Sequence, residues 1–307
     1  MFRTTWAGEC SAWECDELGH LNMSIYLEKF EQARMILFVR LGLETAFQPK
    51  AVSTIRSRDV HIKYLAEARP GQPLRIESAL IDLEASTARV GHVMYHLDGR
   101  IAATLSEHIE HVYLPENRTF RWPSRLRESA DKMRDQLPAP ARARSIAIDT
   151  PVPAFDAATL DQAGVGTLGG GIFRPHETLA AGHIPFSQIF RRVTTTLGWF
   201  REGWGEFADP DFIAAGFSAV ALEMRLVMHR IITPGTAYEL RSGVAQSDGM
   251  VRTIMHNFVD QTDGAALAGG YAAGALFDLN TRRLVMPTRT QRDALDAVTI
   301  ADLAPPA

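Results

Sequence analysis

The chain from residue 14 to residue 34 reads ECDELGHLNMSIYLEKFEQAR, a short polar loop followed by an unbroken helical pattern. Apolar residues at i, i+4, i+7, i+11 and i+15 share one face of this helix: Tyr26, Phe30, Ala33, Leu37 and Leu41. Gly42 follows, where a left-handed residue often ends a helix. The stretch therefore predicts a long helix that buries one face and is preceded by a polar loop.

Parts of this loop and of the region after it occur a second time in the chain. The Gly-His pair at 19–20 and Ser24 return 163 residues later, at 182–183 and Ser187. Further elements repeat at offsets of 164 and 165: Pro70-Gly71 with Pro234-Gly235, Ser78 with Ser242, and Asp98-Gly99 with Asp263-Gly264. An offset that stays almost constant over about 80 residues indicates two copies of one domain.

Each copy continues with extended segments. They are predicted at 52–65, 73–84, 87–97 and 101–114, and again at 217–231, 236–247, 250–260 and 264–278. In the first of them Val60, Ile62 and Tyr64 alternate with polar residues, which suits a sheet with one buried face. The helical stripe of the second copy is Ile189, Val193, Thr196 and Phe200. One long helix followed by antiparallel strands predicts an α+β unit whose sheet wraps the helix.

The repeat sets the expected domain organisation. We predict an N-terminal domain over 1–120, a linker with a short helix over 121–150, a C-terminal domain over 151–287 and a tail over 288–307. The linker is rich in proline and charge, and the tail is expected to be a peripheral helix with a frayed end. The glycine-rich segment 165–172 lacks the Lys-Ser/Thr of a phosphate-binding loop, so we interpret it as a flexible strand.

Composition excludes several classes of function. The formal net charge is −4 and the basic residues are scattered, which argues against a nucleic-acid partner. The two cysteines, Cys10 and Cys15, suit free thiols in a reducing compartment. The N-terminus lacks the apolar region of a secretory signal, and no segment approaches the roughly 20 apolar residues of a membrane-spanning helix. We therefore expect a soluble cytoplasmic protein without a membrane partner.

The opening stretch resembles the N-terminal signature of hotdog-fold thioesterases of the 4-hydroxybenzoyl-CoA thioesterase type. That signature combines an aspartate, a Gly-His-x-Asn loop, and a helix with a Glu-x-Ala-Arg ending, here residues 31–34. It closes on a Pro-Ala-Arg-x-Gly turn, here AEARPG at 66–71. The resemblance covers about 8 to 115 and, more loosely, about 168 to 283. It implies two tandem hotdog domains, each a long helix wrapped by an antiparallel sheet, that form an internal pseudo-dimer.

The resemblance also implies a function, the hydrolysis of an acyl-CoA thioester to a free acid and CoA, with Asp16 as the catalytic carboxylate. Such hydrolysis needs a carboxylate that attacks the carbonyl or activates water, and donors for the developing oxyanion. The first helical turn offers unpaired N–H groups at Asn22, Met23 and Ser24, and His20 is a further substrate-positioning candidate. No metal or cofactor is expected, since CoA belongs to the substrate. Whether Asp16 is nucleophile or general base stays open.

Every one of these residues has a structural alternative. An aspartate before a helix is commonly a turn or capping residue, and Asn22 is equally suited to capping. His20 recurs in the second copy, which favours a hydrogen bond that fixes the loop. Cys15 is most simply a small packed residue.

The second copy differs from the first at the position of the candidate catalytic aspartate. Leu179 stands opposite Asp16, and Pro185 stands opposite Asn22. Leucine can neither attack a carbonyl nor accept a proton. His176 and Glu177 are close in sequence and could replace the carboxylate, but the simpler interpretation is a degenerate site, with one competent centre per chain.

Two other functions remain compatible with a hotdog protein. The first is a non-catalytic acyl-CoA binding or sensor protein, although no helix-turn-helix segment makes it a DNA-binding regulator. The second is a hydratase or dehydratase, whose Asp and His are usually separated by four residues, whereas three lie between Asp16 and His20. The acyl group, the residues that meet the CoA phosphates and a possible homodimer of the pseudo-dimer are left open.

Overall fold

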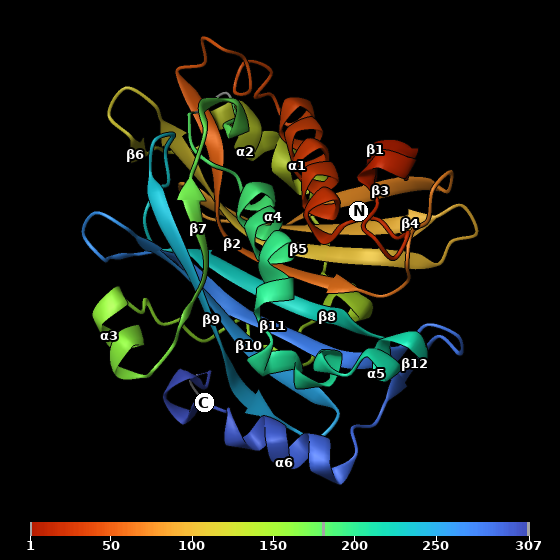
Figure 1. Cartoon of the computed structure of the whole chain (residues 1–307). Coiled ribbons are helices and arrows are strands. Elements are labelled where there is room, and N and C mark those ends of the chain that lie inside the picture. The colour runs from red at the N-terminus through yellow and green to blue at the C-terminus, as the bar shows by residue number, and fades with distance from the viewer. Residues whose placement is uncertain (1, 180–181, 306–307) are drawn as a thin grey trace. The chain divides into compact units, whose positions relative to one another are not determined.

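The computed structural model of the chain describes residues 2–179 and 182–305 (Figure 1). The fold is α+β, as predicted, and it divides into two compact units. The first contains the chain up to Arg142 together with Arg174–Thr194, and the second contains Ala143–Phe173 and the chain from Thr195 onward. The end of the predicted tail, Pro306 and Ala307, lies outside the described residues.

In the first unit a long helix, α1 (Met23–Arg40), packs against one face of an antiparallel sheet (Figure 1). The strands lie in the order β1-β3-β4-β5-β2. Their bounds are β1 (Arg3–Glu9), β2 (Ser53–Tyr64), β3 (Pro73–Leu83), β4 (Thr87–His96) and β5 (Ile101–Tyr113), with β6 (Arg118–Thr119) beside β5. The four strands expected after the helix are thus present, within two residues of the predicted bounds. Strand β1 was not predicted.

The predicted stripe of α1 forms the buried face of the helix. All five members are at most 4% exposed: Tyr26, Phe30, Ala33, Leu37 and Leu41. Gly42 has φ of +97°, as expected for a residue that ends a helix in the left-handed conformation. Trp122, from the predicted linker, stacks on Phe38 of α1 at a ring distance of 5.5 Å. The beginning of the linker is therefore part of the core of the first unit.

Short helical elements complete the first unit. They are η1 (Ala12–Glu14), α2 (Ser124–Ala130), η2 (Asp131–Met133), η3 (Ala139–Ala141) and η4 (Pro175–Glu177). Helix α4 (Phe186–Thr196) also begins in this unit. The segment 174–194 thus counts with the N-terminal sheet, although the repeat alone assigned it to the C-terminal domain.

The second unit repeats the sheet topology of the first. Its antiparallel strands lie in the order β8-β11-β10-β9-β7. Their bounds are β7 (Thr167–Ile172), β8 (Phe217–Met228), β9 (Ala237–Ser247), β10 (Val251–Asp260) and β11 (Ala266–Asp278), with β12 (Arg283–Val285) beside β11. The glycine-rich segment is strand β7, and a Cβ on Gly170 would lie 3.0 Å from the carbonyl oxygen of Tyr238. Close backbone approach explains this glycine without a phosphate.

The helical elements of the second unit are shorter than α1. They are α3 (Ala157–Gln162), η5 (Leu197–Trp199), η6 (Glu202–Ala208), α5 (Pro210–Ala214), α6 (Arg289–Ala297) and η7 (Ala301–Leu303). Phe200 and Trp204 pack with Val244, Ile254 and Leu276 in one core cluster. The predicted tail helix is present as α6.

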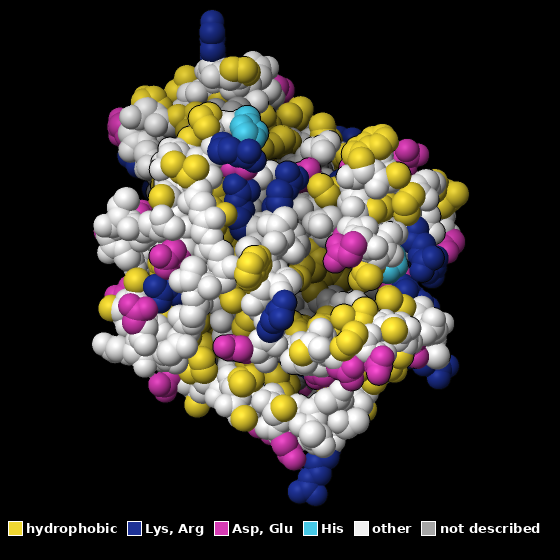
Figure 2. Space-filling view, viewed as in Figure 1, with side chains coloured by type: hydrophobic (Ala, Val, Ile, Leu, Met, Phe, Trp, Pro, Cys, Tyr) yellow, Lys and Arg dark blue, Asp and Glu magenta, His cyan; other side chains and the backbone are white. Residues whose placement is uncertain are grey.

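The surface agrees with the charge pattern of the sequence. On the face drawn in Figure 2, Lys and Arg side chains form small separate groups among acidic and apolar side chains. Within the described ranges, no helix has the length and apolar character needed to cross a membrane.

Candidate active site

The loop before α1 is a tight turn built around Asp16. The N–H of Asp16 donates to the carbonyl of His20 at 2.9 Å, and the N–H of Gly19 donates to the carbonyl of Asp16 at 3.0 Å. The side-chain Oδ1 of Asp16 accepts the N–H groups of Leu18 (3.0 Å) and His20 (3.2 Å). Its Oδ2 accepts no hydrogen bond from residues 2–179 or 182–305. One oxygen of this half-buried carboxylate therefore shapes the loop, and the other is available.

Helix α1 begins with Asn22 as its N-cap. The side-chain Oδ1 of Asn22 accepts the N–H of Ser24 at 3.0 Å and its hydroxyl at 2.8 Å. The N–H of Asn22 itself donates to the carbonyl of Glu14 at 2.9 Å. Among the described residues the N–H of Met23 meets no acceptor. Of the three predicted oxyanion donors, two are engaged in holding the helix start and Met23 remains.

The loop is held against the AEARPG turn that follows β2. The N–H of Leu21 donates to the carbonyl of Ala68 at 2.8 Å, and the hydroxyl of Tyr26 accepts the N–H of Ala68 at 3.3 Å. Burial raises the pKa of Tyr26, so this group stays a neutral hydroxyl. His20 Nε2 lies 3.3 Å from Glu67 Oε2. These contacts give His20 the loop-fixing partner that its structural interpretation requires.

The loop before α4 has the same turn with a different side chain. The N–H of Leu179 donates to the carbonyl of His183 at 3.3 Å, and the N–H of Gly182 donates to the carbonyl of Leu179 at 2.9 Å. Gly182 has φ of +69°, close to the +72° of Gly19. The two loops therefore share these backbone hydrogen bonds, while Leu179 takes the place of Asp16.

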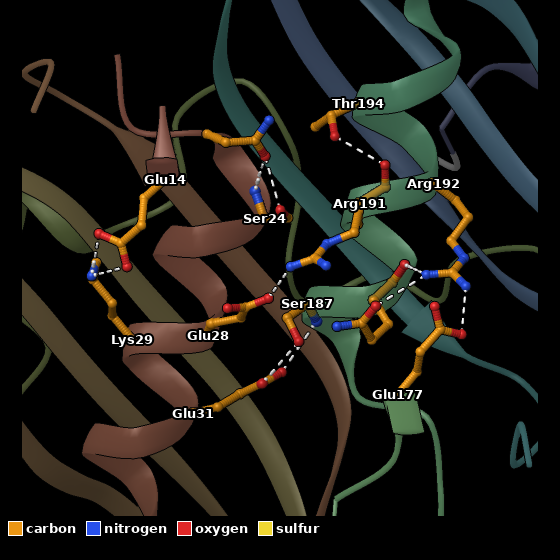
Figure 3. Close-up of polar contacts among 12 residues, drawn as sticks. Glu14, Ser24, Glu28, Lys29, Glu31, Glu177, Ser187, Arg191, Arg192 and Thr194 are labelled. Atoms are coloured by element: carbon orange, nitrogen blue, oxygen red, sulfur yellow. Dashed lines mark hydrogen bonds and ion pairs between the residues drawn. The ribbon is translucent and has the colours of Figure 1, made fainter. Parts of the chain in front are cut away.

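Glu177 corresponds to Glu14 and not to Asp16. Glu14 forms an ion pair with Lys29 of α1 at 2.7 Å. Glu177 forms an ion pair with Arg192 of α4, also at 2.7 Å (Figure 3). Burial alone would raise the pKa of Glu177, but hydrogen bonds and charge from Arg192 and Arg174 outweigh it and hold the pKa at about 2. Glu177 is thus committed to a structural ion pair. The geometry argues against its replacing the missing carboxylate.

A different carboxylate, which the sequence did not indicate, lies at the start of α4. Glu31 Oε1 accepts the N–H of Ser187 at 3.1 Å, and Oε2 accepts the Ser187 hydroxyl at 2.9 Å (Figure 3). Pro185 stands where Asn22 caps α1 and has no side-chain acceptor. Glu31, on α1, therefore caps α4. Burial raises its pKa to about 7, against the opposing charge of Arg34 and the bonds from Ser187.

The two repeated histidines differ in environment. His20 is partly exposed and lies beside an acidic partner, Glu67. His183 is 5% exposed, and burial, followed by the charges of Arg56 and Arg34, lowers its pKa to about 3. His183 is therefore a neutral imidazole at physiological pH. The repeated Gly-His motif is therefore common to two turns whose histidines have different surroundings.

A Ser-His-Glu series lies inside the first unit. Ser78 Oγ is 2.6 Å from His92 Nδ1, and His92 Nε2 is 3.0 Å from Glu107 Oε1. Arg34 reaches the other oxygen of Glu107 at 2.5 Å. Although these are the residue types of a hydrolytic triad, all three members are at most 1% exposed, so the hydroxyl is not accessible to a substrate. The network is structural and explains the arginine of the Glu-x-Ala-Arg ending.

Known proteins resemble this chain in sequence over its N-terminal part and in fold over most of its length. Residues 10–130 match the thioesterase-like superfamily. The match includes the Asp16 loop, α1 and strands β2 to β5, which form most of the first unit.

A curated relative matches part of the chain. It is the L-carnitine dehydrogenase/betainyl-CoA thioesterase of Agrobacterium fabrum, 28% identical over 125 residues. The match covers 41% of this chain and 26% of the relative, so it spans about a quarter of the length of that protein. The likeness is therefore to one region of a larger protein.

Solved structures resemble almost the whole chain. A protein described as an oleoyl thioesterase from Lactobacillus plantarum has a TM-score of 0.67 at 11% identity, and covers 90% of this chain and 96% of its own. The 12:0-ACP thioesterase of Umbellularia californica has a TM-score of 0.65 at 13% identity, with 90% and 94% covered. Such low identities establish the fold alone, which is that of tandem hotdog thioesterases.

Proposed function

We propose that this protein hydrolyses an acyl-CoA thioester to a free carboxylic acid and CoA at the junction of the Asp16 loop and α1. The observation that supports this most is the pairing, at one junction, of an available carboxylate oxygen on Asp16 with an available N–H on Met23. Thioester hydrolysis requires a carboxylate and an oxyanion donor. The superfamily match over residues 10–130 includes this junction.

Each group has a defined chemical role in the proposed reaction. Asp16 either attacks the thioester carbonyl directly or removes a proton from the attacking water. In both cases the carbonyl oxygen becomes an oxyanion that accepts the N–H of Met23, near the positive end of the 18-residue helix α1. Collapse of the tetrahedral intermediate expels the CoA thiolate. Losing one such donor typically costs about 3 to 4 kcal/mol of transition-state stabilisation.

The substrate is best sought among CoA thioesters. The curated relative is named as a betainyl-CoA thioesterase, whereas the name of one structural relative, the 12:0-ACP thioesterase, refers to acyl carrier protein. Since the sequence likeness lies with the former, betainyl-CoA is the first thioester to test. Aliphatic and aromatic acyl-CoA esters and an acyl carrier protein thioester complete the panel.

Asp16→Asn is the direct test of the mechanism. Asparagine keeps an Oδ1 that can accept the N–H groups of Leu18 and His20, so the loop is preserved while the charge is lost. We expect kcat to fall by about 10²- to 10⁴-fold, the usual contribution of a positioned base, with acyl-CoA affinity retained. Release of free thiol, followed with a chromogenic disulfide reagent, measures turnover, and calorimetry measures binding.

Matched variants control for charge and for position. Glu17→Gln removes the neighbouring, exposed carboxylate, and Leu179→Ala alters the equivalent position before α4. Both are expected to keep near-wild-type kcat. Undiminished turnover in Asp16→Asn, or an equal loss in Glu17→Gln, would exclude Asp16 as the catalytic group.

Acyl-CoA binding without turnover is the second candidate function. It is favoured by one observation, that Oδ1 of Asp16 already holds two backbone N–H groups, which explains the aspartate without catalysis. Saturable binding of an acyl-CoA by the wild type, with no thiol released over the whole panel, would establish this function in place of hydrolysis.

A further inference from the structure

The two cysteines of the chain face each other across the loop that contains η1. Cys10 Sγ lies 3.5 Å from Cys15 Sγ. Both are free thiols, and Cys10 is fully buried whereas Cys15 is half-buried. A disulfide needs the sulfurs at about 2.05 Å, so one of them must move by about 1.5 Å.

The backbone anchors differ at the two ends of the pair. Cys10 follows β1, its N–H donates to the carbonyl of Gln72 at 3.0 Å, and its carbonyl accepts the N–H of Gly71 at 2.7 Å. Cys15 ends η1, and its Sγ–H donates to the carbonyl of Ser11 at 3.5 Å. Cys10 is thus fixed to the AEARPG turn. Cys15 is the partner that can move.

We propose that Cys10 and Cys15 form a reversible intramolecular disulfide when a peroxide is present, and that this bond displaces the Asp16 loop. The half-buried Cys15 sulfur attacks the O–O bond and becomes a sulfenic acid, with release of one water. The Cys10 sulfur then attacks the Cys15 sulfur and a second water leaves. Two thiols lose two protons and two electrons, and the peroxide is reduced to two waters.

The order of attack follows from burial. Burial, and then the hydrogen bond with Cys15, raises the pKa of Cys10 to about 12, so Cys10 remains a thiol and is a poor first nucleophile. Glu14 adds to this effect and Lys29 opposes it, and those two form the ion pair drawn in Figure 3. Cys15 is also the more exposed of the two residues. It is therefore the site of the first oxidation.

Asp16 is covalently next to the residue that moves. Cys15 forms an isolated bridge with Leu21, and the carbonyl of its neighbour Glu14 accepts the N–H of Asn22, so this segment is tied to the end of the Asp16 loop. A shift of Cys15 toward Cys10 therefore strains the bridge to Leu21 and the hydrogen bond between Asn22 and Glu14. The expected loss of activity rests on the proposed hydrolase function, whereas formation of the bond does not.

Thiol counting tests the bond itself. The full-length protein is treated with hydrogen peroxide, denatured, and alkylated with N-ethylmaleimide before intact-mass and peptide analysis. We expect two alkylated cysteines before oxidation and none after it, with a peptide link between Cys10 and Cys15 that dithiothreitol removes. Cys15→Ser and Cys10→Ala should show no such link. A sulfinic acid on Cys15 with Cys10 still alkylated, or a disulfide between chains, would overturn the proposal.

Two readouts test the displacement of the loop. Hydrogen exchange at the N–H groups of Leu18 and His20 should accelerate on oxidation, whether or not the protein is a hydrolase. Thiol release from acyl-CoA should fall by about 10²-fold, the scale of a 1 Å misplacement, return with dithiothreitol, and stay unchanged in peroxide-treated Cys15→Ser. If the bond forms but exchange and turnover are unaltered, the cysteines form a disulfide without a switch, and the proposal is wrong in that part.

Discussion

At the scale of single residues, two carboxylates beside the same arginine have opposite ionisation properties. Glu107 is buried, which alone raises its pKa, but Arg34, His92 and Ser57 outweigh this and lower the pKa to about 2. Glu31 is also buried, but the charge of Arg34 and the hydrogen bonds from Ser187 do not outweigh that burial, and its pKa rises to about 7. Arg34 forms an ion pair with Glu107, whereas it acts on Glu31 through its charge. Glu31 is therefore a buried acid of the first unit that titrates near neutral pH.

This difference predicts a pH dependence that Glu31→Gln removes. Because the folded pKa of about 7 exceeds the ordinary 4.5, the contribution of Glu31 to stability is fully present below pH 4.5 and is lost as the pH rises through 7. The size of the loss is about 3 kcal/mol. Urea unfolding of wild type and Glu31→Gln at pH 4.5 and pH 8 should show the wild type losing stability relative to the variant by this amount.

Glutamine suits this comparison because its amide can still accept the N–H of Ser187. Other groups, including Glu107, titrate in both proteins and cancel in the difference. A constant stability difference across the pH range would show that Glu31 is ionised with an ordinary pKa in the folded protein.

At the scale of elements, the starts of the two helices are capped in different ways. Asn22 caps α1 from its own position in sequence, whereas α4 is capped by Glu31 of α1. The local cap has the usual Asx geometry and is visible in sequence. The second one needs the two helices to be packed together, as in Figure 3.

The cap of α1 predicts the effect of Asn22→Ala. Loss of the acceptor for Ser24 should lower the free energy of unfolding by about 1 to 2 kcal/mol, as measured by urea denaturation. Asn22→Ser, which restores a capping oxygen, should recover most of that stability. If Asn22 bound substrate directly, serine would recover stability without recovering the KM for acyl-CoA, so the two roles separate in this pair of variants.

At the scale of the whole molecule, the two units share one sheet topology but are not two consecutive pieces of chain. Residues 174–194 belong with the first unit, and they provide the residues that meet Glu31 and Glu28. A fragment comprising residues 1–142 lacks them. It would leave the buried carboxylate of Glu31 without Ser187 and expose the face of α1 that α4 contacts.

We therefore predict that the fragment 1–142 is less stable than the same residues in the full chain. Thermal unfolding followed by circular dichroism should show a lower midpoint for the fragment, and addition of the fragment 143–307 should raise it. A fragment that unfolds at the midpoint of the full chain would show that the first copy is a self-sufficient domain, as its sequence alone suggests.

Local sequence pattern predicted most of the fold. The stripe from Tyr26 to Leu41 and the alternation around Ile62 reflect helical and strand periodicity, so the helix and eight strands could be placed within a few residues. Strand β1 was missed because its seven residues pair with β3, some 70 residues away, and only one of them, Trp6, is apolar at a buried or half-buried position. The Asp16 loop could be found from its resemblance to a known signature and from its difference from the second copy.

What the sequence determined by itself is the repeated α+β unit and the contrast between Asp16 and Leu179, because periodicity and internal repetition are properties of neighbouring positions. Only the tertiary structure decided which oxygen of Asp16 is available, that Met23 holds the remaining donor, and that Cys10 faces Cys15. It alone shows Glu31 capping Ser187, 156 residues away. The physical reason is that hydrogen bonds and burial depend on which side chains packing brings within about 3 Å, and no local pattern records that distance.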